Sequence, residues 1–233
     1  MDKEHLLLLH GALGAKSQFA SLIPLLEDQF QIHTLDFEGH GRSLMRKRPF
    51  REVYFAENVM EYLDEISLSC INIFGYSMGG KVGLFLAKTY PERIKKIFTF
   101  ATKFSWTSES VDREISSLYA EKISEKVPHF AIMLEEIHVT SGWRNVVKKT
   151  KEMMLTIVTE SSPTIGELDQ IQQEVRVTVG DKDRLVSIEE TVNAYRSLPK
   201  GQLQIFPNTP HPIEKAPLAN LAHSLMEFFK AKA

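Results

Sequence analysis

Cysteine is almost absent from this sequence, since Cys70 is the only one among 233 residues. A single cysteine excludes a disulfide within the chain and a metal cluster built from thiolates, and it fits a reducing compartment. Two further patterns are missing. The spacing typical of metal sites does not occur among His5, His33, His129, His138 and His223. The dinucleotide-binding turn is not formed by Gly11, Gly14, Gly39 and Gly41. The sequence therefore gives no reason to expect a metal or an organic cofactor.

Long hydrophobic runs are missing as well. The apolar run at 6–9 contains four leucines and ends at His10-Gly11. It is too short for a secretory signal, which needs a basic start and a longer apolar stretch. No segment approaches the 18 or so apolar residues of a membrane span. We therefore expect a soluble cytoplasmic protein without a membrane span.

An excess of positive charge is the third feature that the chain lacks. Lys and Arg number 28 against 30 Asp and Glu, which gives a net charge of −2. A nucleic-acid-binding protein would carry a basic surface, so this class of partner is not expected. Hydrophobic residues make up 43% of the chain, enough to bury a sizeable core. The composition predicts a folded protein and leaves monomer and homodimer open.

Short apolar runs alternate with segments of helical periodicity. The runs predict strands at 6–9, 31–36, 70–76, 96–101, 175–180 and 202–206. Apolar residues at helical spacing predict helices at 17–28, 53–68, 78–90, 187–198 and 218–230. Alternating strands and helices favour an α/β fold with a mostly parallel six-stranded sheet and helices on both faces.

One segment interrupts this alternation. Residues 103–167 contain no convincing strand, and their apolar residues recur at helical spacing. We therefore predict a helical insertion between the fourth and fifth strands. The core would then consist of residues 1–102 and 168–233.

The strongest local motif is Gly75-Tyr76-Ser77-Met78-Gly79, which follows a predicted buried strand and starts a helix. A G-x-S-x-G segment in this position forms a tight turn that exposes the serine hydroxyl above the sheet. The helix N-terminus then places backbone N–H groups beside that oxygen. Ser77 is therefore the candidate nucleophile.

A serine hydroxyl needs a base, and the base needs a third group that holds it. Asp181 and Asp183 follow the fifth strand, and His211 follows the sixth. The carboxyl ends of parallel strands meet at one edge of the sheet, where α/β proteins bind ligands. We predict His211 as the general base and Asp183 as the acid that orients it. Asp181 remains the alternative for that acid.

A negative charge that develops on a substrate oxygen needs nearby hydrogen-bond donors. The segment His10-Gly11-Ala12-Leu13-Gly14 directly follows the first strand. We expect the backbone N–H groups of Ala12 and Met78 to form this oxyanion hole. The alternative is that the segment is only a glycine-rich turn.

These motifs, taken in order, resemble the α/β-hydrolase fold superfamily. The matching segments are His10-Gly11, the segment from Asp36 to Ser43 (DFEGHGRS), the turn at Ser77, and the late segments with Asp183 and His211. The resemblance implies that the insertion is a lid over the active site. The loop at 36–43 is typical of small esterases, thioesterases and related lyases, and its His40 and Arg42 would shape the edge of the pocket.

The sequence departs from this family at its start. Many members have two antiparallel strands before the His-Gly segment, whereas only nine residues precede His10 here. The expected sheet is therefore a reduced one, six-stranded and all parallel.

Large apolar side chains near these motifs are candidates for the substrate pocket, although those of the lid also fit its own core. These candidates are Met78, Phe104, Trp106, Trp143, Met153 and Met154, and His10 and Gly11 are also expected at the pocket. Lys103 and Arg184 would either hold an acidic part of a substrate or remain ordinary solvated charges.

The resulting hypothesis is a serine hydrolase that cleaves a small carboxylic ester or thioester through an acyl-enzyme on Ser77. Its partner would be that small-molecule substrate. A carbon–carbon bond hydrolase or lyase with the same three residues is one alternative, because a fold does not fix a reaction. A non-catalytic ligand-binding member of the fold is the other.

Overall fold

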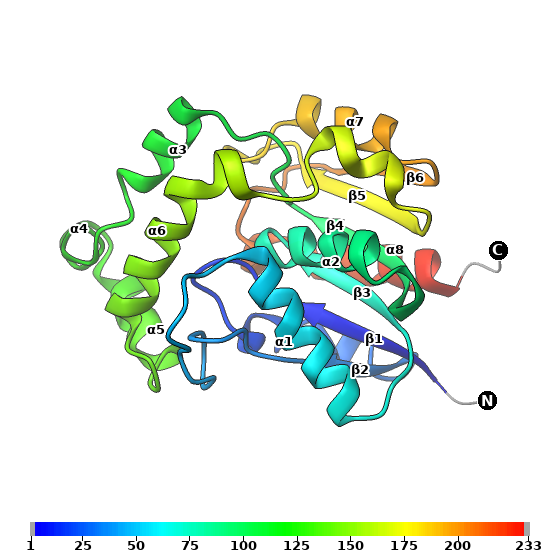
Figure 1. Cartoon of the computed structure of the whole chain (residues 1–233), viewed down its shortest axis with the longest axis horizontal. Coiled ribbons are helices and arrows are strands. Elements are labelled where there is room, and N and C mark those ends of the chain that lie inside the picture. Colours follow the sequence, from blue (N-terminus) through cyan, green and yellow to red (C-terminus); the bar gives the residue numbers. More distant parts are fainter. Residues whose placement is uncertain (1–2, 231–233) are drawn as a thin grey trace.

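Six strands form one parallel sheet in the computed structural model, which describes residues 3–230 (Figure 1). The strands are β1 (Glu4–Leu9), β2 (Phe30–Thr34), β3 (Ile71–Tyr76), β4 (Ile94–Phe100), β5 (Glu174–Gly180) and β6 (Gly201–Phe206). Their order is β2-β1-β3-β4-β5-β6, and every neighbouring pair is parallel. The predicted six-stranded, all-parallel sheet is confirmed.

Helices cover both faces of the sheet because its strands are apolar on both sides. In β1, Leu7 and Leu9 pack in one core cluster with α1 (Glu52–Glu65), α2 (Met78–Thr89) and α7 (Ile188–Ser197). Leu6 and Leu8 point the opposite way and pack with α8 (Leu218–Lys230). Burial of each such side chain contributes about 1.5–3 kcal/mol. The two cores fix the sheet, and with it the strand ends that carry the candidate catalytic groups.

The helix predicted for 17–28 is wrong. The structure has two short 3-10 turns there, η1 (Lys16–Phe19) and η2 (Ile23–Leu25). Pro24 explains the difference, because proline lacks a backbone N–H and disfavours helical geometry at the residue before it. The apolar residues still reach the core, since Phe19, Leu22 and Leu26 are buried under the α8 face.

Four helices lie between β4 and β5, where the sequence predicts a helical insertion. They are α3 (Ser108–Ile115), α4 (Ala120–Lys126), α5 (Pro128–Ile137) and α6 (Trp143–Glu160), and η4 (Ile165–Gln170) leads back to β5. Figure 1 shows these helices beyond the carboxyl ends of the strands. The short turns η3 (Pro91–Arg93) and η5 (Ile213–Lys215) precede β4 and α8. The insertion therefore faces the edge of the sheet at which Ser77, Asp183 and His211 follow their strands.

None of the helices between residues 3 and 230 is both long enough and apolar enough to cross a bilayer.

Candidate active site

Ser77 lies on a strained turn between β3 and α2. Its φ and ψ are 51° and −114°, a conformation that costs energy for any residue with a side chain. The Ser77 N–H donates to the Phe100 carbonyl at 2.8 Å, which fixes the turn to β4. A side chain at Gly75 would place its Cβ 2.4 Å from the Gly80 backbone, and one at Gly79 would lie 2.1 Å from the Leu9 carbonyl. The glycines therefore allow α2 to start this close to the strands.

The His211 ring is held by Asp183. The Nδ1 atom of His211 lies 2.8 Å from Oδ2 of Asp183, whose side chain is fully buried. The other carboxylate oxygen accepts the N–H groups of Leu185 and Val186 at 2.8 and 2.9 Å. A carboxylate accepts hydrogen bonds, so Nδ1 carries the proton and Nε2 keeps a lone pair. This is the tautomer that a general base needs.

Asp181, the alternative acid, has a different partner. Its Oδ1 accepts the backbone N–H of Thr209 at 3.1 Å. This bond closes the turn that leads to His211 but leaves the ring to Asp183. The structure thus brings Asp183, and not Asp181, against the imidazole.

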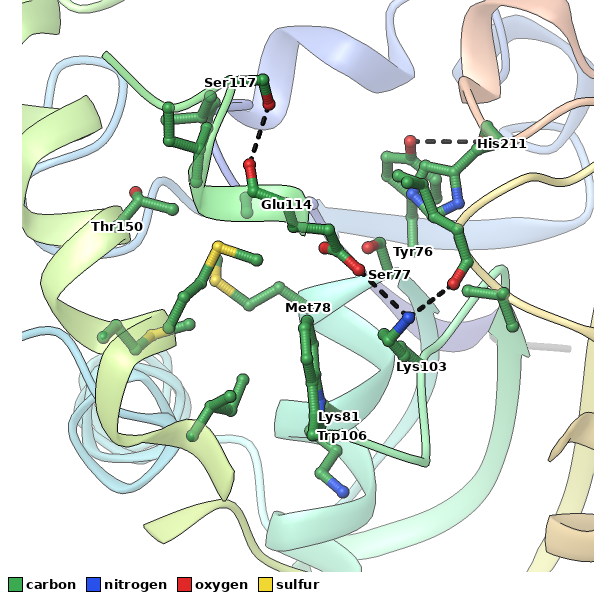
Figure 2. A pocket seen from close by; sticks show the side chains of 18 of the residues that line it. Tyr76, Ser77, Met78, Lys81, Lys103, Trp106, Glu114, Ser117, Thr150 and His211 are labelled. Carbon is green, nitrogen blue, oxygen red and sulfur yellow. Dashed lines mark hydrogen bonds and ion pairs between the residues drawn. The ribbon is translucent and has the colours of Figure 1, made fainter. Parts of the chain in front are cut away.

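Ser77 and His211 line the same cavity, which has a volume of about 340 Å³ (Figure 2). Tyr76 supports this wall, because its hydroxyl donates to the His211 carbonyl at 3.3 Å. Among residues 3–230, no hydrogen bond joins the Ser77 hydroxyl to the His211 ring. Catalytic hydrogen bonds are often loose without substrate and tighten when it binds.

The two predicted oxyanion donors are both free to bind an oxygen. The backbone N–H groups of Ala12 and Met78 have no acceptor within the described part of the chain. Met78 is the first residue of α2, whose positive end favours negative charge. The Gly11–Ala12 peptide is held in a trans arrangement, and its Gly11 oxygen accepts bonds from His10 Nδ1 at 2.8 Å and from Gly14 N–H at 3.1 Å. The Ala12 N–H consequently points to the opposite side.

His10 supports this loop from inside the protein and does not line the cavity. Its Nδ1–H donates to Gly11, and its Nε2 accepts the Phe37 N–H at 3.1 Å. Acceptance of the Phe37 N–H requires the neutral ring, and burial lowers the pKa of His10 to about 4. Gly11 also stays outside the lining, because it packs so closely on Tyr76 that a Cβ would lie 2.7 Å from that ring. These two residues position the Ala12 amide.

The cavity walls are mainly apolar. Of the predicted pocket residues, Met78, Trp106, Met153 and Met154 line it. Other apolar lining residues were not predicted, although two of them lie two and three residues after Asp183: Leu13, Tyr76, Leu118, Ile157, Leu185 and Val186. Phe104 packs in the α1–α2 core cluster instead. Trp143 packs in a separate small cluster with residues of α4 and α5.

Charged groups also reach the cavity. Lys103 lines it, with Nζ 3.0 Å from Glu114 and 2.7 Å from the Leu185 carbonyl (Figure 2). Arg184 does not line this cavity; it lines a second hollow together with Asp183 and His211. Lys81 was not predicted, although it stands four residues after Ser77 and hence on the same side of the helix start. Its ammonium donates to the Pro163 carbonyl, and burial lowers its pKa to about 8.

The loop at 36–43 is fixed from within, and none of its residues lines the cavity, so the expected role of His40 and Arg42 at the pocket edge stays a prediction. His40 is buried, stacks on Phe50 at 4.9 Å and bonds the Glu38 carbonyl at 3.2 Å. The Arg42 N–H donates to Asp36 at 3.1 Å. Between residues 3 and 230, no three His, Cys, Asp or Glu side chains are grouped so that they could hold a metal.

Comparisons with known proteins show which family and fold this chain resembles. Residues 4–120 match the family model described as alpha/beta hydrolase fold. The human serine hydrolase-like protein is 30% identical over 158 residues, which cover 67% of this chain and 75% of that protein. The matched region spans only 28% and 50% of the length of two other curated relatives.

Solved structures extend the likeness over the whole chain. Carboxylesterase CesB from Bacillus subtilis has a TM-score of 0.81 at 19% identity, with 100% of this chain and 85% of that chain covered. The 2-hydroxy-6-oxo-6-phenylhexa-2,4-dienoate hydrolase from Rhodococcus sp. strain RHA1 has a TM-score of 0.80 at 20% identity, with 98% and 91% covered. At this coverage the shared fold includes the helical insertion.

Proposed function

Because the chain belongs to the alpha/beta hydrolase fold family, we propose that it is a serine hydrolase. It cleaves a small carboxylic ester or thioester through an acyl-enzyme on Ser77. The observation that carries this proposal is the 2.8 Å contact between His211 and the buried Asp183, on the same cavity wall as Ser77. It gives the imidazole the tautomer in which it can take the serine proton.

The reaction follows from the positions of these groups. Nε2 of His211 takes the Ser77 proton while the serine oxygen attacks the carbonyl carbon. The amides of Ala12 and Met78 stabilise the negative charge on the carbonyl oxygen. His211 then returns the proton to the leaving alcohol or thiol. A water molecule, activated by the same ring, attacks the acyl-enzyme and frees Ser77.

The substrate class follows from the cavity. A volume of about 340 Å³ is near the lower end for ligand pockets, so the bound part of the substrate is small. Apolar side chains of the insertion form the wall opposite Ser77, including Met153, Met154 and Ile157. We assign the insertion the role of a lid that covers an apolar acyl or alcohol group.

Carbon–carbon bond hydrolysis is the second candidate. Three cationic side chains line the cavity, Lys81, Lys103 and Arg113, against the two carboxylates of Glu52 and Glu114. This excess of positive charge favours a substrate with a carboxylate beside its reacting carbonyl. The hydrolase from Rhodococcus, whose fold is similar, is named for such a dienoate substrate. A panel of simple esters and vinylogous keto acids would separate the two reactions.

Kinetics with a p-nitrophenyl ester series test the proposal. The wild type should release a burst of nitrophenol, and Ser77→Ala should lower kcat more than about 10⁴-fold. Ser117→Ala is the matched control, because Ser117 lines the same cavity and donates only to the Glu114 carbonyl. Retention of most activity in Ser77→Ala would refute the acyl-enzyme. A protein that binds esters without turnover would be the non-catalytic alternative.

A further inference from the structure

His138 connects the insertion to the loop that carries the Ala12 amide. It follows α5, is buried, and makes two hydrogen bonds with residues far away in the sequence. Its Nε2 lies 3.0 Å from the Leu13 carbonyl, and the Gly41 N–H lies 2.9 Å from its Nδ1. A carbonyl only accepts and an amide N–H only donates, so the ring is neutral with its proton on Nε2.

A chain of hydrogen bonds leads from this ring to the oxyanion hole. The Leu13 oxygen and the Gly14 N–H belong to one peptide group, and the Gly14 N–H donates to the Gly11 oxygen at 3.1 Å. The Gly11 oxygen and the Ala12 N–H belong to a second peptide group, which lies two peptide bonds earlier in the sequence. Two trans peptides thus join the ring to the proposed donor. Successive bonds of this kind polarise one another.

The loop needs such support because its backbone is strained. Leu13 has a φ of 58°, in the left-handed region that a leucine rarely adopts. His10 holds the Gly11 oxygen from the sheet side, with a 2.8 Å bond. His138 holds the Leu13 oxygen from the insertion side. The two rings therefore fix two carbonyls of the same loop, two residues apart, from two different parts of the fold.

We propose that His138 is a positioning residue that couples docking of the insertion to the orientation of the Ala12 amide in the oxyanion hole. The proposal rests on the serine hydrolase function given above. The α5–α6 corner is the turn at 138–142 between these two helices. When this corner docks on the loop, the His138 ring supplies the donor for the Leu13 carbonyl. Movement of that corner away from the loop removes the donor and releases the Ala12 peptide.

The surroundings of His138 keep its ring neutral. The rings of His40 and His10 lie nearby, with His40 at 5.8 Å, and Asp36 is the carboxylate that acts on it. Burial lowers the pKa of His138, and the charge of Asp36 opposes this effect. Protonation of Nδ1 would remove the lone pair that accepts the Gly41 N–H.

Replacement of His138 by glutamine or by asparagine tests its hydrogen bonds to Leu13 and Gly41 one at a time. In His138→Gln the amide nitrogen takes the place of Nε2 and can still donate to Leu13. In His138→Asn the amide oxygen takes the place of Nδ1, accepts the Gly41 N–H and leaves Leu13 without its donor. We expect His138→Asn to lower kcat about 10- to 30-fold with KM nearly unchanged, and His138→Gln to stay within about 3-fold of wild type.

Thr140→Val is the matched control, because Thr140 attaches the same corner to the Arg42 carbonyl at 3.2 Å without contacting Leu13. It should keep the wild-type kcat. The proposal is overturned if the Gln and Asn variants lose the same activity, if only KM changes, or if Thr140→Val matches His138→Asn. Melting curves of all variants separate these outcomes from a loss of folding.

Hydrogen exchange of the Gly14 amide gives a measurement that does not depend on turnover. It should be faster in His138→Asn than in His138→Gln, and equal exchange in the two variants contradicts the proposal. A wild type that neither hydrolyses esters nor reacts with fluorophosphonate at Ser77 overturns the proposed function. In that case the exchange comparison still decides whether His138 positions the loop.

Discussion

The two sides of the cavity are built in different ways. On the sheet side, Ser77, Asp183 and His211 follow three parallel strands, and backbone hydrogen bonds fix the serine turn and the aspartate carboxylate. On the insertion side, the wall consists mainly of apolar side chains of α6, and α3 contributes the charged Arg113 and Glu114. Part of the insertion packs in a small cluster of its own, apart from the two sheet cores.

We therefore expect the sheet side to carry out the reaction and the insertion side to determine the shape of the cavity. The sheet side depends on backbone geometry and holds Asp183 within hydrogen-bond distance of His211. The insertion side depends on packing, and several of its apolar residues remain exposed on the outside: Ile132, Met133, Val139, Leu155 and Val158. Helices with few buried contacts have low local stability. Changes on the sheet side should therefore affect kcat, and changes on the insertion side should affect substrate preference.

The largest effect is expected where the sheet side orients the base. Asp183→Asn should lower kcat about 10⁴-fold, because an amide in place of the carboxylate favours the wrong tautomer of His211. Asp181→Asn, the neighbouring control, should stay within about 10-fold, since Asp181 accepts only the Thr209 N–H. Steady-state kinetics of both variants test the assignment. A larger loss in the Asp181 variant would reverse it.

The second effect concerns stability and the buried His10. Its ring stays neutral in the folded protein down to a pKa of about 4, whereas an unfolded histidine binds a proton near pH 6.5. The unfolded state therefore binds more protons between these values. The contribution of His10 to stability is complete above about pH 6.5 and decreases as the pH falls toward 4, by about 1.4 kcal/mol per pH unit.

Urea unfolding at about pH 7 and about pH 5 measures this loss, which should be about 2 kcal/mol for this one ring. In His10→Gln the loss should be smaller by a similar amount, because glutamine does not titrate. His40 and His138 also have lowered pKa values, so part of the decrease in unfolding free energy remains in that variant. An unchanged pH dependence in His10→Gln would show that the ring is not held neutral.

The smallest effect is expected on the insertion side. Met153→Ala removes part of the wall opposite Ser77 and so enlarges the cavity. The preference for octanoate over butyrate esters should rise about 10-fold, while kcat for the best ester changes little. Met133→Ala is the matched control, because Met133 lies in the same insertion but outside the cavity lining, and 38% of it is exposed. A collapse of kcat in Met153→Ala, or an equal shift in the control, would break the division between the two sides.

The sheet side could be predicted from the sequence because its signals are local. Each strand is a short apolar run, and a strand, a glycine turn and a helix determine where Ser77 lies. The order of Ser77, Asp183 and His211 along the chain then places all three at one edge of the sheet. The choice between Asp181 and Asp183 needed the structure, because both residues follow the same strand.

The insertion side could be predicted only as helical. Periodicity gives the inward face of a helix but not which cavity or cluster that face meets, so Trp143 and Met153 look alike in the sequence. His138 gave no signal at all, because its two partners, Leu13 and Gly41, are 125 and 97 residues away. The helix expected at 17–28 failed for a local reason, Pro24, that overrides an apolar pattern.

The central claim is that Ser77 is the nucleophile and that His211, held by Asp183, activates it. Reaction with a fluorophosphonate, followed by mass spectrometry of the peptides, tests this most directly. We predict one adduct, on Ser77, that is absent in Ser77→Ala and forms much more slowly in His211→Ala. An adduct on another residue, or ester hydrolysis that continues when Ser77 is replaced, would contradict the account.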